Sequence, residues 1–305
     1  MHGMSLSDEN LILDCPVVSD AAPVVVGGIG GSGTRVVAQL LKDWGFDMGS
    51  DLNESLDDLG FTALFKRPSL WPIHQHVPQL QEALSLYLTA RGQPPAGTAL
   101  GDKHKLKVET VLNSIQKEQA WIESGHLQER RQPLQTIDER TNPSWGWKEP
   151  NTHLFLRYLL SAIPNLRYLH VVRHGLDMAL SNNQTQLTVW GSRILDRPVD
   201  VNSPHDSLAF WVAVHQSILR AQTEFPDKVK IVRFESLFEH ETAALAEIQT
   251  FLKIRAMPTA VCKNVPSLQK PDSINRYKSA PKFSISASAE YLLKTLGYSV
   301  GGGNL

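Results

Sequence analysis

Three short apolar runs indicate buried β-strands along the chain. They lie at residues 23–26, 168–172 and 230–234, and glycine or charged residues follow each of them. A short apolar run that ends in turn-forming residues is typical of a strand that is covered on both faces. We therefore expect these three segments to be strands of one sheet.

Helical patterns lie between and after these strands. Apolar residues three and four positions apart predict a helix over residues 34–44, directly after the first strand. Further helices are expected at 176–188, after the second strand, and near 240–253 and 286–296, after the third. This alternation predicts an α/β fold in which a parallel sheet, similar to that of P-loop proteins, is flanked by helices.

Residues 50–140 interrupt the alternation. They are polar, rich in glutamine and broken by proline, and they hold helical patterns at 80–88 and 108–121. We interpret the chain as a single α/β domain, residues 1–305, with a largely helical insertion or lid at 55–140. Ligands of parallel sheets bind at the carboxyl ends of the strands, so the residues that follow each strand are the candidates for function.

Composition and charge limit the partners. Apolar residues make up 42% of the 305 residues and charged residues 20%, which is ordinary for a globular protein. The formal net charge of −1 gives no overall basic field for nucleic acid or an anionic membrane, so an anion site must be local. The first twenty residues contain no Lys or Arg, and no apolar run is long enough to span a bilayer. We expect a cytoplasmic protein.

A glycine-rich segment, which we call the glycine loop, follows the first strand. It reads Gly-Gly-Ile-Gly-Gly-Ser-Gly-Thr-Arg over residues 27–35. Glycine allows the backbone to approach a ligand closely, and N–H groups at the start of a helix attract anions. The residues expected to bind a phosphate or sulfate here are Gly30, Gly31, Ser32, Gly33, Thr34 and Arg35.

Two known nucleotide motifs match the glycine loop only in part. The phosphate loop of nucleotide triphosphatases ends in Gly-Lys-Ser/Thr, whereas Gly33 is followed by Thr34 and Arg35, so the phosphate-binding lysine is missing. The dinucleotide pattern G-x-G-x-x-G is matched from Gly28, but it requires a second strand with a terminal acidic residue about 20 positions later. Residues 45–51 are not strand-like, which disfavours a dinucleotide fold.

A second anion site is indicated where the second strand ends. Arg173 follows that strand directly, and Ser181 lies about two turns into the expected helix. A guanidinium and a hydroxyl can bind one phosphate together through charge-assisted hydrogen bonds. The alternative is a surface Arg and an ordinary helical Ser.

These motifs together resemble the sulfotransferase family. Its members carry a loop of the S-G-T type after the first strand, and a later strand that ends in R-x-P-x-x-x-x-x-S, whose Arg and Ser hold a 3′-phosphate. Residues 32–34 fill the first pattern, and Arg173 and Ser181 fill the second, with Gly175 in place of Pro. Residues 232–237, Val-Arg-Phe-Glu-Ser-Leu, are similar to the family segment V-R-Y-E-D-L.

The resemblance implies a donor and a reaction. A bacterial-type sulfotransferase would bind 3′-phosphoadenosine 5′-phosphosulfate (PAPS) and transfer its sulfuryl group, without a metal, to a hydroxyl of a small molecule, carbohydrate or peptide. The Gly-Thr-Arg sequence at 33–35 is similar to the heparan-sulfate branch of the family. The resemblance covers residues 24–54, 145–184 and 228–240.

The glycine loop departs from the family at one position. Members usually have Arg or Lys directly before S-G-T, where this chain has Gly31. Lys148, followed by Glu-Pro, resembles the lysine of the K-D-P segment in tyrosylprotein-type sulfotransferases, which contacts the transferred group. The resemblance thus implies that Lys148 supplies the charge that Gly31 does not. The alternative is that Lys148 is a surface residue before a helix.

An acceptor hydroxyl also requires a general base. Asp51 and Glu54 lie about 20 residues after the glycine loop, a distance similar to that of the catalytic Glu in tyrosylprotein-type enzymes. Alternatively, Asp51 or Asn53 caps a helix that begins at Glu54. Candidates for a histidine base, the other solution in this family, are His104, His153 and His174.

Other functions and partners stay open. A P-loop kinase or nucleotide triphosphatase would require Mg²⁺ for turnover, and a nucleotide-binding module would not turn over at all. We expect no metal site, because His74 and His76 lack a third ligand at suitable spacing. Several tryptophans either stack on a sugar acceptor or lie in the core. They are Trp71, Trp121, Trp145, Trp147 and Trp190.

Overall fold

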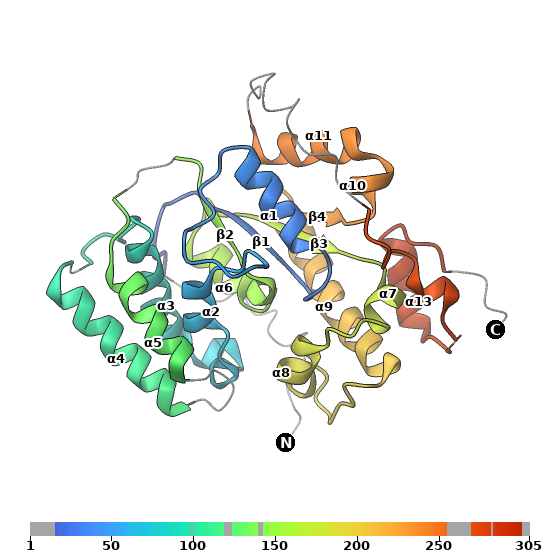
Figure 1. The fold of residues 1–305 in the computed structure, drawn as a ribbon, viewed down its shortest axis with the longest axis horizontal. Helices are drawn as coiled ribbons and strands as arrows, with labels where there is room; N and C mark the ends of the chain where they lie inside the picture. Colours follow the sequence, from blue (N-terminus) through green and yellow to red (C-terminus); the bar gives the residue numbers. More distant parts are fainter. Residues whose placement is uncertain are drawn as a thin grey trace. The chain divides into compact units, whose positions relative to one another are not determined.

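The computed structural model describes residues 16–98, 100–118, 124–139, 143–254, 270–281 and 283–300. The fold is α/β, with a four-stranded parallel sheet in the order β2-β1-β3-β4 and helices beside it (Figure 1). The strands are β1 (Val24–Gly28), β2 (Gly146–Lys148), β3 (Arg167–Val172) and β4 (Val229–Arg233). The expected fold class and the three expected strands are confirmed, and β2 is a strand that the apolar pattern did not reveal.

Most of the expected helices are also confirmed. Those at 34–44, 80–88, 240–253 and 286–296 correspond to α1, α3, α11 and α13. Their bounds are α1 (Thr34–Asp43), α3 (Val77–Ala90), α11 (Glu241–Leu252) and α13 (Ala287–Thr295). The helix expected at 108–121 is α4 (Asp102–Glu118), and residues 119–121 lie outside the described part of the chain. Helices that the pattern did not predict are α2 (Leu59–Phe65), α5 (Ser124–Gln135), α6 (Leu156–Ala162), α9 (Pro204–Glu224) and α10 (Ser236–Glu239).

The single helix expected at 176–188 is wrong. The segment instead forms α7 (Gly175–Ala179) and α8 (Thr185–Ile194), with a loop between them. Polar side chains in this loop bond to the backbone in place of helical partners: Asn183 Oδ1 accepts from Thr185 N at 3.3 Å, and Gln184 Nε2 donates to Met178 O at 3.1 Å. Such local bonds compete with helix formation. Ser181 therefore lies in a loop and not on a helix.

The described residues form two compact units. The first, which we call the loop unit, comprises 27–37 and 169–300; the second, the lysine unit, comprises 16–26 and 38–168. The range 55–140 lies in the lysine unit and holds α2 to α5, together with the 3-10 helices Pro68–Leu70 and Ile73–Gln75. That this range is an insertion or lid of a single domain stays a prediction.

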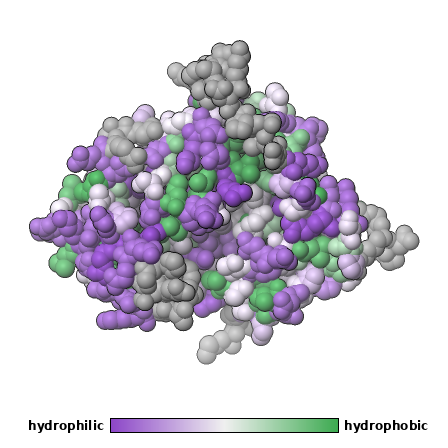
Figure 2. Space-filling model, in the orientation of Figure 1, coloured by the Kyte–Doolittle hydropathy of each residue, from purple (hydrophilic) through white to green (hydrophobic). Residues whose placement is uncertain are grey.

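The surface and the core are ordinary for a globular chain. The face drawn in Figure 2 is mostly hydrophilic, with small, separate hydrophobic areas. No helix in the described residues combines the length and the apolar character needed to cross a bilayer.

In the core of the lysine unit, the Trp147 ring stacks on Phe61 with centroids 5.2 Å apart. Trp147 and Trp190 are fully buried, so a role for them in sugar stacking is wrong, and Trp121 lies outside the described residues.

Gly33 permits close packing between the glycine loop and the residue that follows β4. Its φ of +99° lies in the region that favours glycine, and a Cβ at this position would approach Phe234 Cδ2 to 2.1 Å. The aromatic ring therefore occupies the space that any side chain at position 33 would need. The conformation of the loop and its packing both depend on this glycine.

We predict that Gly33→Ala destabilises the protein far more than Gly45→Ala. Gly45 has a similar φ of +86° but open space around its Cα, so its substitution introduces backbone strain alone. We expect a loss of about 1–2 kcal/mol for Gly45→Ala, and of about 2–5 kcal/mol for Gly33→Ala because overpacking is added. Urea unfolding measures both. Equal losses would show that a clash with Phe234 adds nothing to the destabilisation caused by Gly33→Ala.

Candidate functional site

The glycine loop joins β1 to α1 through a tight turn. Gly31 has a φ of +89°, and Ser32 N donates to Ile29 O at 2.9 Å to close the turn. Ser32 and Thr34 are buried, whereas Gly31 and Arg35 are exposed. Ser32 Oγ has no hydrogen-bond partner among the described residues. A buried hydroxyl and the N–H groups at the start of α1 are together suited to an anion.

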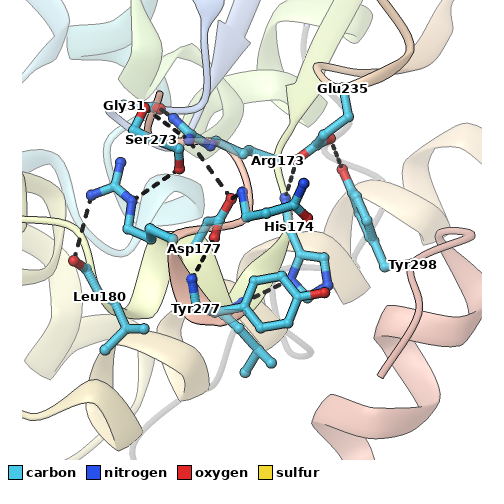
Figure 3. Close-up of polar contacts among 12 residues, drawn as sticks. Gly31, Arg173, His174, Asp177, Leu180, Glu235, Ser273, Tyr277 and Tyr298 are labelled. Carbon is cyan, nitrogen blue, oxygen red and sulfur yellow. Dashed lines mark hydrogen bonds and ion pairs between the residues drawn. The ribbon is translucent and has the colours of Figure 1, made fainter. Parts of the chain in front are cut away.

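Arg173 leaves the end of β3 directly beside this loop. Its side chain is only 5% exposed, and its Nη1 points at Gly31 O, 3.5 Å away (Figure 3). Nη2 donates to Ser273 Oγ at 3.0 Å, while Nε has no partner among the described residues. Burial lowers the pKa of the guanidinium, and Asp177, 3.7 Å away, opposes this. The alternative of a surface Arg is therefore wrong.

Ser181 follows α7 in the chain and lies beside the same part of the glycine loop. A Cβ built on Gly31 would lie 3.7 Å from Ser181 Oγ, so the hydroxyl is close to the loop backbone. Asn183 donates its backbone N–H to Ser181 Oγ at 3.2 Å, and its side chain lies beside Gly30. The fold thus brings Arg173 and Ser181 together at Gly31. Both side chains can donate hydrogen bonds to an anion.

A further part of this cluster comes from residues 273–279, which we call the C-terminal segment. Ser273 contacts Arg173, and Arg276 Nε donates to Ser273 O at 3.2 Å (Figure 3). The segment includes the 3-10 helix Arg276–Ser279. No strand or periodic pattern in the sequence predicts where this segment lies. Its basic residues Arg276 and Lys278 make it, from the sequence, an alternative to Lys148 as the source of positive charge.

Lys148 lies in the lysine unit at the end of β2. Its side chain is 2% exposed, and its Nζ donates to Ser55 O at 3.0 Å and to the carboxylate of Asp57. A buried ammonium is stable only when it is paired, and Asp57 provides the pair. The alternative that Lys148 is a surface residue is wrong. Asp57, which the sequence analysis did not single out, is its carboxylate partner.

Asp51 and Glu54 occupy different environments. Asp51 forms an ion pair with Arg130 at 3.1 Å, and burial raises the pKa of its carboxyl group. Glu54 is exposed. Their candidacy as the general base stays a prediction.

The capping alternative for this segment is wrong. Asn53 Oδ1 accepts from Ser55 N and Asp57 N, both at 2.9 Å, and so closes a turn where a helix was expected. The next helix, α2, begins later, and its cap is Asp58, which accepts from Phe61 N at 2.8 Å.

Glu149 is a titratable group that sequence reasoning missed. It is 3% exposed, and its Oε1 accepts from Asn151 Nδ2 at 2.7 Å. Burial raises the pKa of its carboxyl group to about 7, and Asp57 adds to this effect. A carboxyl that titrates near neutral pH thus follows Lys148 directly in the chain.

The candidate histidines are all buried, and their candidacy as the general base stays a prediction. His174 Nδ1 accepts from Leu176 N at 3.2 Å, and its Nε2 lies 3.1 Å from Ser299 O, which together indicate a neutral ring. Burial also lowers the pKa of His174. His104 is buried, with its Nε2 2.8 Å from Leu134 O, and His153 is buried as well. No group of three or more His, Cys, Asp and Glu side chains suited to a metal ion was found in the described residues.

Comparisons with known proteins agree with the motifs. A sequence model described as "Sulfotransferase family" matches residues 23–258. No match was found among curated proteins.

Solved sulfotransferase structures are similar over most of the chain. The sulfotransferase domain of the olefin synthase of Synechococcus PCC 7002 is 14% identical, with a TM-score of 0.48 over 92% of this chain and 97% of that one. The sulfotransferase domain from the curacin biosynthetic pathway is 13% identical, with a TM-score of 0.46 over 92% and 99%. Sulfotransferase STF9 from Mycobacterium avium is 14% identical, with a TM-score of 0.42 over 98% and 82%.

Glu149 predicts a pH dependence of stability. Below its ordinary pKa of 4.5 the carboxyl is protonated in the folded and unfolded states alike, and it contributes no difference. As the pH rises to about 7 the unfolded state loses its proton first, so the folded state loses stability by up to about 3 kcal/mol. We expect Glu149→Gln to match the wild type near pH 4.5 and to exceed it near pH 8 in urea unfolding.

The exposed Glu82 in α3 provides the control for this comparison. Glu82→Gln should differ from the wild type by a constant amount across the same pH range. A constant difference for Glu149→Gln as well would contradict the raised pKa.

Proposed function

The chain belongs to the sulfotransferase family, and on that premise we propose that it transfers the sulfuryl group of PAPS to an acceptor hydroxyl. The observation that carries the proposal is the meeting of Arg173 and Ser181 at Gly31 in the glycine loop. The guanidinium and the hydroxyl provide one anion site, and the N–H groups at the start of α1 provide a second beside it. PAPS carries two such groups, a 5′-phosphosulfate and a 3′-phosphate.

Each part of the site has a role in this proposal. The N–H groups of the glycine loop, with Ser32 and Thr34, hold the 5′-phosphosulfate. Arg173 and Ser181 hold the 3′-phosphate, and the buried Nε–H of Arg173 is a donor available to it. Arg35, exposed in the first turn of α1, adds positive charge at the mouth of the loop.

The reaction is a displacement at sulfur. The acceptor oxygen forms a bond to sulfur while the bond from sulfur to the 5′-phosphate oxygen breaks, and adenosine 3′,5′-bisphosphate leaves with the bonding electrons. Such transfers require alignment and charge stabilisation more than covalent chemistry. We assign the stabilising charge to Lys148, because position 31 carries no cation. The acceptor proton passes to a carboxylate, for which Asp51 and Glu54 are candidates and Asp57, in contact with Lys148, is a third.

The acceptor is proposed by class only. A small molecule, a carbohydrate or a peptide can present the hydroxyl that this reaction needs. A second candidate function, nucleotide binding without turnover, is favoured by one observation: Lys148 is already neutralised by Asp57. Turnover then requires that pair to open, or to act as a unit.

We predict that the protein binds adenosine 3′,5′-bisphosphate, the proposed product, in the presence of EDTA. In this proposal both anion sites consist of protein groups alone, so chelation should leave the affinity unchanged. Isothermal titration calorimetry with and without EDTA measures this. Binding that requires Mg²⁺ would instead favour a kinase or nucleotide triphosphatase, and no binding would remove the proposal.

We predict that Lys148→Met lowers kcat for sulfuryl transfer by about 10²–10³ and leaves KM for PAPS nearly unchanged, because the charge acts in the transition state. Lys148→Arg should retain more activity, since it keeps the charge. Lys230, which pairs with Glu247 at 2.9 Å, provides a matched control as Lys230→Met. A normal kcat for Lys148→Met would assign the stabilising charge elsewhere.

Replacement of the three carboxylates identifies the base in the same assay. Removal of a general base costs about 10²–10⁴ in rate while folding is retained. The variants are Asp51→Asn, Glu54→Gln and Asp57→Asn. If none of them slows transfer, no carboxylate in this segment is the base.

A further inference from the structure

Asp177 is a buried carboxylate that the proposed chemistry does not use. It lies in α7, four residues after Arg173, and it is 1% exposed. Its Oδ2 accepts from Asn275 N at 2.8 Å, and its Oδ1 accepts from Tyr277 N at 3.1 Å. Figure 3 shows this carboxylate between the C-terminal segment and Arg173. Both hydrogen bonds therefore bind it to a segment about a hundred positions away in the sequence.

These bonds determine where the C-terminal segment lies. A buried carboxylate is costly unless it is hydrogen-bonded, and backbone N–H groups of residues 275 and 277 satisfy both of its oxygens. Tyr277 is further held by its ring, which stacks on His174 with centroids 4.2 Å apart. The segment is thus fixed against the turn that follows β3.

The fixed segment in turn holds Arg173. Ser273, two residues before Asn275, accepts from Arg173 Nη2 at 3.0 Å, and Asp177 itself lies 3.7 Å from the same nitrogen. The guanidinium is therefore held from the side of the C-terminal segment, with Nη1 directed at Gly31 O. Without this support, a long Arg side chain would sample several rotamers.

We propose that Asp177 is a positioning residue for the 3′-phosphate subsite, acting through the C-terminal segment and Arg173. The inference rests on the proposed function, in which Arg173 binds the 3′-phosphate. For anion affinity, the proposal predicts a change opposite in sign to the change expected from the charge of Asp177 alone. Removal of a negative charge beside an anion site should strengthen anion binding, whereas loss of a positioning residue should weaken it.

The test measures two ligands by calorimetry at one pH. Adenosine 3′,5′-bisphosphate carries the 3′-phosphate and adenosine 5′-monophosphate does not. For Asp177→Asn we expect affinity for the bisphosphate to fall by about tenfold or more, as when a charge-assisted contact is lost, while affinity for the monophosphate stays within about twofold. A bisphosphate affinity that is unchanged or higher would overturn the proposal, and so would equal losses for both ligands.

Asp206 provides the matched control. It also accepts from a backbone N–H, that of Asp200 at 2.7 Å, and pairs with Arg197 at 2.6 Å, but it is not part of the cluster at Arg173. Asp206→Asn should leave both affinities unchanged. Hydrogen exchange at the amides of Asn275 and Tyr277 should accelerate in Asp177→Asn alone, and unchanged exchange there would contradict the anchoring role.

Ser273→Ala extends the test if Asp177→Asn does not fold. It removes the hydrogen bond to Arg173 and, unlike Asp177→Asn, does not alter a buried charged group. We expect a selective, severalfold loss for the bisphosphate, and an unchanged affinity would overturn the proposal. The wild type separates failure of the proposed function from failure of the positioning role of Asp177. If the wild type does not bind the bisphosphate more tightly than the monophosphate, the proposed function itself fails.

Discussion

The buried guanidinium of Arg173 is the constraint on which the organisation of the loop unit depends. A charge that is 5% exposed must be compensated, and its partners come from three separate segments. They are the carbonyl of Gly31, the hydroxyl of Ser273 and the carboxylate of Asp177. One donor, Nε–H, has no partner in the described part of the chain. This arrangement holds the cation in place.

The lysine unit also contains a buried cation, which is compensated in a different way. Lys148 is also buried, but Asp57 neutralises it directly and the carbonyl of Ser55 accepts a second hydrogen bond from the ammonium. In the loop unit the nearest carboxylate to Arg173, Asp177, is occupied by two backbone N–H groups and lies farther away. Arg173 thus keeps one donor without a partner among the described residues, whereas Lys148 is paired directly with a carboxylate.

The sequence predicted those parts of the structure that depend on local pattern. The run before the glycine loop and the apolar spacing of α1 identified β1, the loop and α1. The signal for α9 was also local and was missed, since Ser203, Pro204 and Asp206 form a typical helix start. The break at Ser181 was not predictable from periodicity, because Asn183 and Gln184 replace helical hydrogen bonds with their side chains. The contacts of Asp57 and of the C-terminal segment could not be predicted from the sequence, because they join residues 91 to 100 positions apart.

Phosphorus-31 NMR of bound adenosine 3′,5′-bisphosphate tests the central claim most directly, because its two phosphates give separate signals. The account predicts that both signals shift when the ligand binds to the wild type. With Arg173→Ala at saturating ligand, the 3′ signal should return toward its free position while the 5′ signal stays shifted. Two signals that keep their wild-type shifts in Arg173→Ala would contradict the assignment of Arg173 to the 3′-phosphate.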